Sequence, residues 1–128
     1  MSDEREQILQ ELMKELGLYT AGLTITLVAL PIPIKLPGNE GGGVNLAREL
    51  LPAVIRAYEI VNEQPLPEEQ QAWACAALLH WILATESILV YPVNAREYRA
   101  DAAVLNMRLG KAVLADLLEW LNKQDDIA

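Results

Sequence analysis

The last third of the chain sets the strongest constraint on the fold. Residues 94–123 contain one glycine and no proline, and they keep helical periodicity throughout. An ordinary surface helix needs one apolar stripe, and this one has two. It therefore lies centrally in its domain, or it serves both its own core and a partner. The first stripe is Tyr98, Leu105, Leu109, Ala112, Val113 and Trp120, and the second is Ala103, Met107, Leu114, Leu118 and Leu121.

The beginning of the chain predicts a shorter helix followed by a change of character. Apolar residues recur at helical spacing over residues 4–16, and Gly17 follows where a left-handed cap belongs. Residues 19–37 contain β-branched side chains and then three prolines. We expect this segment to be extended, with a short strand at 23–29 before the proline-rich part. A short second helix that ends before Pro31 is the alternative.

Glycine and proline mark the breaks between the remaining predicted helices. Residues 37–43 read PGNEGGG and are typical of a flexible loop. A helix begins near Asn45, and Pro52 should kink or split it because the proline ring clashes with the preceding turn. The next helix has Pro67 in its first turn and is closed by Pro92.

The length and composition of the chain fit one domain over residues 1–128. Apolar residues make up 52% of the sequence, which excludes a disordered chain. A net charge of -8 disfavours a surface that binds nucleic-acid phosphates. The predicted fold class is therefore mainly α: a single-domain bundle of four or five helices with a short extended, proline-rich segment at about residues 19–37.

Two apolar stretches raise the question of a membrane. Residues 21–34 are too short to span a bilayer, and residues 72–91 are long enough but contain His80 and Glu86. We therefore expect no membrane segment. The acidic N-terminus lacks the pattern of a signal peptide, and a lone cysteine excludes a disulfide framework. Together these features predict a cytoplasmic protein.

The sole histidine and the sole cysteine are the first candidates for chemistry. His80 and Cys75 are five residues apart, whereas two ligands on one helix face are three or four apart. We interpret His80 as a packed histidine with one hydrogen bond and Cys75 as a buried, unreactive thiol. The glycine-rich loop lacks the Lys or Ser/Thr of a phosphate-binding loop. The sequence thus predicts no catalytic residue, no cofactor and no metal.

Paired carboxylates supply the one enzyme hypothesis, a metal-dependent all-α hydrolase. Glu59 and Glu63 are four residues apart on one predicted helix, and Glu97 and Asp101 are four apart on another. If the two pairs faced each other, their oxygens would suit Mg²⁺. In this general design the chain resembles the all-α nucleotide pyrophosphatases, although their longer glutamate motif is absent. The hypothesis requires all four carboxylates to converge.

The function we expect is non-catalytic binding of another protein, as an adaptor, assembly factor or regulator. We also expect the chain to bind a second copy of itself. Gly110 lies in the second stripe of the last helix, where it would let another backbone approach closely. The alternative is that the first helix of the same chain covers this stripe. Two further hypotheses are an acidic inhibitor of a basic nucleic-acid-binding surface and a carrier of an apolar small molecule. The predicted homodimer interface is Ala103, Met107, Gly110, Leu114 and Leu118.

Overall fold

The protein is a bundle of α-helices. The computed structural model describes residues 3–30, 36–37 and 45–127. Within that part of the chain every regular element is helical, so the predicted fold class, a mainly α bundle, is confirmed. The elements are α1 (Asp3–Ala29), the π-helical turn η1 (Leu46–Leu50), α3 (Leu51–Val61), α4 (Glu68–Val90) and α5 (Glu97–Ile127).

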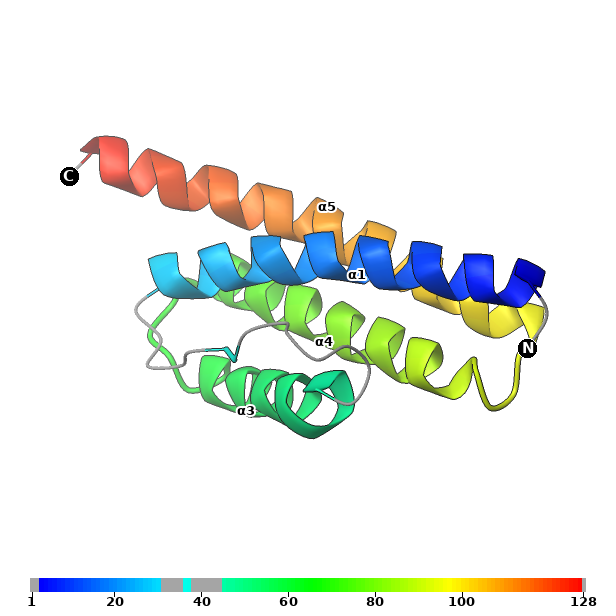
Figure 1. The fold of residues 1–128 in the computed structure, drawn as a ribbon. Coiled ribbons are helices and arrows are strands. Elements are labelled where there is room, and N and C mark those ends of the chain that lie inside the picture. The colour runs from blue at the N-terminus through cyan, green and yellow to red at the C-terminus, as the bar shows by residue number, and fades with distance from the viewer. Residues whose placement is uncertain (1–2, 31–35, 38–44, 128) are drawn as a thin grey trace.

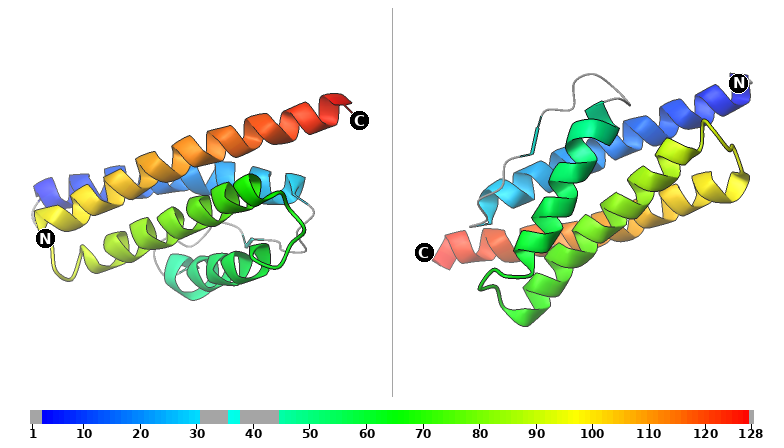
Figure 2. Two further views of the ribbon diagram at one scale, coloured as in Figure 1. Left: turned by 180° about the vertical axis from the view of Figure 1, so that it is seen from behind. Right: turned by 90° about the horizontal axis from the view of Figure 1, so that it is seen from below.

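Three long helices lie side by side, and the shorter α3 packs on α4 (Figures 1 and 2). α1 and α5 run in the same direction, and α4 runs opposite to both (Figure 1). The most extensive packing is between α4 and α5, which a short turn connects. The C-terminal end of α5 projects beyond the other helices (Figure 1), because its 31 residues make a rod of about 45 Å.

The core is mostly aliphatic, with two fully buried aromatic residues at the contact between α1 and α4. The Trp81 indole N–H donates to the Thr20 hydroxyl over 2.9 Å, and that hydroxyl donates to the Leu16 carbonyl over 2.7 Å. The buried Tyr19 hydroxyl donates to the Ala77 carbonyl. Both aromatic residues therefore have a partner for their polar atom, as burial requires.

The prediction of an extended segment is wrong for residues 19–29, which continue α1 without a break. Gly17 lies inside this helix and does not end it. The alternative prediction, a short second helix that ends before Pro31, gives the correct end of helical structure. It is wrong about the start, because these residues continue α1 and do not form a separate helix. Residues 31–35 of the proline-rich part, and residues 38–44 of the predicted loop, lie outside the described residues.

Helical structure in this segment has two physical causes. The hydroxyl of Thr24 donates to the backbone carbonyl of Thr20, one turn earlier. The hydroxyl of Thr26 donates in the same way to the backbone carbonyl of Gly22. Such bonds satisfy threonine within a helix. Leu23 and Leu27 are buried in the core on the same helix face, and this burial outweighs the modest preference of β-branched residues for strands.

Two of the three predicted breaks after residue 45 are confirmed. Pro52 is the second residue of α3 and follows η1 with helical backbone angles at Leu50 and Leu51, so the helix changes there from π to α and is not split. Pro67 immediately precedes α4, and its missing N–H is not needed there. α4 ends at Val90, directly before the turn that contains Pro92.

Candidate interaction surface

The second stripe of α5, predicted as a homodimer interface, lies largely inside the fold. Ala103, Met107, Gly110 and Leu114 are buried, and Leu118 is partly buried. α1 and α4 both pack against α5, so the alternative in which this chain covers its own stripe accounts for the burial. A second copy would reach the four buried residues only by displacing a helix. Homodimer formation remains a prediction, and these four residues offer no surface for it in the folded chain.

α1 and α5 approach each other closely at Gly110. A Cβ atom at this position would overlap the Tyr19 side chain and lie 2.7 Å from its Cε2 atom. Beside this crossing, the Lys111 ammonium lies 2.7 Å from a Glu15 carboxylate oxygen. Burial raises the pKa of the Tyr19 hydroxyl well above its ordinary value, so the hydroxyl stays protonated and can donate to Ala77.

The first stripe of α5 faces solvent. Tyr98, Leu105 and Leu109 are 61%, 58% and 47% exposed, respectively. Ala112 is exposed as well, and Val113 is partly buried. Three large apolar side chains thus follow one another along the outside of the longest helix of the bundle.

α4 carries a second row of exposed apolar residues. Leu79 and Leu83 are one turn apart and are 38% and 48% exposed. Val90 continues this face two turns later and is 37% exposed. α4 and α5 pack against each other. Whether their two exposed rows lie on the same side of this contact depends on how the two helices are aligned.

His80 and Asn106 fix this alignment. His80 Nδ1 lies 2.9 Å from Asn106 Oδ1, across the seam between α4 and α5. The Asn106 amide nitrogen donates to the Ala102 carbonyl, so its oxygen is the atom that faces the imidazole. His80 is packed with one hydrogen-bond partner, in agreement with our interpretation of the sequence.

The exposed rows of both helices flank the outer side of this seam. On the inner side Ala84 and Ala103, each one turn or less from the pair, are fully buried. On the outer side Leu83 and Leu109, each three residues from the pair, are exposed. The two rows therefore form one surface, which we call the α4–α5 face. Its apolar residues are Leu79, Leu83, Val90, Tyr98, Leu105 and Leu109, and the exposed Glu86 lies between Leu83 and Val90.

The carboxylates of the hydrolase hypothesis do not converge. Glu59 and Glu63 lie at the end of α3, next to Gln71 at the start of α4, whose side chain donates to the Val61 and Asn62 carbonyls. Glu97 and Asp101 follow the other end of α4, about 30 Å of helix away. Among the described residues, no group of three His, Cys, Asp or Glu side chains could hold a metal ion.

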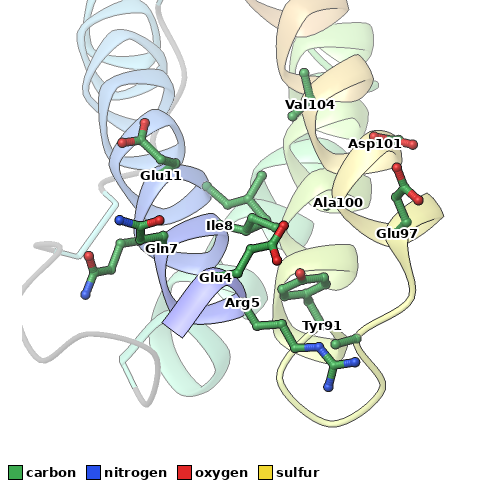
Figure 3. Close-up of a pocket in the computed structure, with 13 residues that line it drawn as sticks. Glu4, Arg5, Gln7, Ile8, Glu11, Tyr91, Glu97, Ala100, Asp101 and Val104 are labelled. Atoms are coloured by element: carbon green, nitrogen blue, oxygen red, sulfur yellow. The ribbon is translucent and has the colours of Figure 1, made fainter. Parts of the chain in front are cut away.

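An open groove of about 1260 Å³ separates the start of α1 from the start of α5. Glu4 and Glu11 come from α1, and Glu97 and Asp101 come from α5 (Figure 3). The carboxylates are thus divided between two walls, and Arg5 extends below Glu4 toward Tyr91 (Figure 3). The groove is acidic, but it brings no nucleophile and base together.

Cys75 has the properties of a structural thiol. Its Sγ donates to the Asn62 side-chain oxygen over 3.1 Å, which joins α4 to the end of α3. Burial raises the pKa of this thiol. A reactive cysteine needs the opposite shift, because the thiolate is the nucleophile.

Two helices, α1 and α4, are long and apolar enough to cross a membrane by length and composition alone. Core helices of soluble bundles meet the same criteria, so this finding is weak support for a membrane segment. Comparisons of the chain with protein families, curated proteins and solved structures find no match.

Proposed function

We propose that the protein acts by non-catalytic protein–protein interaction and that it forms a homodimer through the α4–α5 face. The observation that carries this proposal is the pair of exposed apolar rows beside the His80–Asn106 seam. Six side chains of this size and exposure present on the order of 500 Å² of apolar surface, at the upper end for a monomer. With a polar rim the face approaches the roughly 800 Å² per partner of a stable complex.

Two features favour a second copy as the occupant. A two-fold axis brings the same face of each copy together, and two layers of two helices then form a four-helix packing. The flank of α5 beside the face carries charges of both signs, including Asp101 and Arg108. A two-fold axis can pair such charges between copies, whereas a single-sign rim would repel itself.

Sedimentation equilibrium at micromolar concentration tests the proposal. The wild type should sediment at about twice its chain mass of 14.2 kDa. Leu83→Glu and Leu109→Glu should each give folded monomers, because a buried carboxylate without a partner opposes association. The matched control is Ile25→Glu, since Ile25 is 63% exposed on α1, outside the face.

Three outcomes would contradict the proposal. A wild-type monomer throughout the concentration range would exclude the homodimer. Dissociation by Ile25→Glu alone would move the interface to α1. Binding of the monomer to vesicles of neutral lipid, lost in Leu83→Glu, would assign the face to a membrane surface instead. Circular dichroism of each variant shows that the helices are intact.

A further inference from the structure

We propose that His80 makes association through the α4–α5 face depend on pH, so that protonation of its ring favours separate monomers. This inference rests on the homodimer proposed above. His80 lies on the seam between the two exposed rows and is partly accessible to solvent. It is also the only histidine in the chain, and histidine is the side chain that ordinarily changes charge between about pH 5 and 8.

The hydrogen bonds at the seam determine which ring nitrogen carries the proton. The Asn106 amide nitrogen donates to the Ala102 carbonyl over 2.9 Å, so Asn106 presents its oxygen to His80. That oxygen only accepts, and His80 Nδ1–H must therefore donate to it. The neutral ring is satisfied at Nδ1 and keeps Nε2 as an acceptor. A protonated ring gains a second donor, Nε2–H, and a full positive charge.

The residues of α4 and α5 within one turn of the ring offer nothing that would stabilise this charge once a second copy covers the face. Along α4 and α5, among the described residues, no carboxylate lies within one turn of the pair. α1 packs against both α4 and α5, and α3 packs against α4 on the side that carries Gln71 and Cys75. The residues within one turn are Ala76, Ala77, Leu83 and Ala84 on α4 and Ala102, Ala103, Leu109 and Gly110 on α5.

The charged groups nearest to the seam lie about two turns away and have both signs. Arg99, two turns from Asn106 on the same side of α5, is positive and disfavours a second positive charge. Glu86 is exposed in the same row of α4, between Leu83 and Val90, and is six residues from His80. Asp101 and Arg108 project from the opposite flank of α5. The thiol of Cys75, on the α3 side of α4, is neutral.

The direction of the pH effect follows from these contacts. In the monomer, water reaches the ring and hydrates its charged form. In the dimer, aliphatic side chains of the second copy replace that water, and an unpaired charge is strongly disfavoured. Association therefore favours the neutral ring and releases protons from any protonated rings. By linkage, the dimer dissociation constant should rise as the pH falls.

The experiment compares the dimer dissociation constant at about pH 7.5 and pH 5.5 by sedimentation equilibrium. Carboxylates titrate mostly below this range, so the sole histidine dominates the change. Each protomer contributes one ring, and we expect the dissociation constant of the wild type to rise about tenfold or more. His80→Gln should show no such rise, because its amide N–H still donates to Asn106 but acquires no charge.

A second variant leaves the histidine in place. Asn106→Asp puts a carboxylate beside the ring, where it pairs with the imidazolium, and the weakening at low pH should disappear. A dimer whose constant is the same at both pH values, tightens at low pH, or responds equally in His80→Gln would overturn the inference and leave the homodimer standing. A wild type that is monomeric at both pH values would overturn the homodimer, and the inference with it.

Discussion

The two apolar stripes of α5 are similar in the sequence and opposite in the structure. The second stripe lies under α1 and α4 and includes the small residues Ala103 and Gly110, which are both buried. The first stripe presents large side chains such as Leu105 and Leu109 to solvent. Small residues let a neighbouring backbone or ring approach closely, which suits the inside of a bundle. A small residue at a point of close approach, such as Gly110, therefore marks the core side, whereas the hydrophobicity of the two stripes does not distinguish them.

The largest expected difference between the stripes comes from one leucine in each. Leu114 is buried and Leu109 is half exposed. Leu114→Ala should lower the free energy of unfolding by about 3 kcal/mol, because it removes buried contacts and leaves a cavity. Leu109→Ala should lower it by less than about 1 kcal/mol. Urea denaturation in the Leu83→Glu background, where association is blocked, measures both. Equal effects would mean that the two stripes are equally buried.

A methyl group added at Gly110 tests the closeness of the crossing. Gly110→Ala should cost about 2 kcal/mol, even though alanine is the better helix former, because Tyr19 is buried and cannot move aside cheaply. Ala112→Gly, on the exposed side of the same helix, should cost about 1 kcal/mol through helix propensity alone. Urea denaturation compares the two. A stabilised Gly110→Ala variant would show that α1 and α5 lie further apart.

Removing one hydroxyl should have a smaller effect and should couple to that methyl group. Tyr19→Phe loses the hydrogen bond to Ala77 and should cost about 1 kcal/mol. The same change also removes the atom that a Cβ at Gly110 would overlap most. In the Gly110→Ala background, Tyr19→Phe should therefore cost less, or even stabilise. A double-mutant cycle measures this coupling, and strict additivity would contradict it.

Much of the fold could be predicted from the sequence because its breaks are local. Pro67 and Pro92 each act through their own ring and missing N–H, so their effect does not depend on distant residues. The end of the first helix could not be predicted in this way. Thr20 and Thr24 favour a strand in isolation, but their hydroxyls bond to carbonyls of the preceding turn, and Thr20 also accepts from Trp81.

The candidate surface was less predictable than the fold. Periodicity shows which residues of α5 share a stripe, but it does not show which stripe the rest of the chain covers. That choice depends on contacts over long sequence separations, such as Tyr19 with Gly110 and His80 with Asn106. The sequence held one usable signal, since a mid-helix glycine is consistent with a close approach. It gave no indication that the approaching residue would be Tyr19 of the same chain.

The smallest expected effect concerns the ion pair at the edge of the buried stripe. The hydrogen bond and charge of Lys111 lower the pKa of Glu15 below its ordinary value near 4.5. Folding therefore gains stability from this carboxylate at neutral pH and loses it as the pH falls below that value. Both side chains are more than one third exposed, so Glu15→Gln should cost about 0.5 kcal/mol or less.

Urea denaturation at about pH 7 and pH 3, at low salt, measures this contribution, because it is lost as the pH falls through the lowered pKa of Glu15. The difference between wild type and Glu15→Gln should be smaller at the lower pH. Glu119→Gln is the control, since its partner Lys123 lies on the same helix and both groups are about two thirds exposed. A Glu15→Gln deficit that persists at low pH would mean that this side chain stabilises the crossing of α1 and α5 by packing. The contact between α1 and α5 would then include Glu15 and Lys111 as packing residues, beside the apolar residues of the buried stripe.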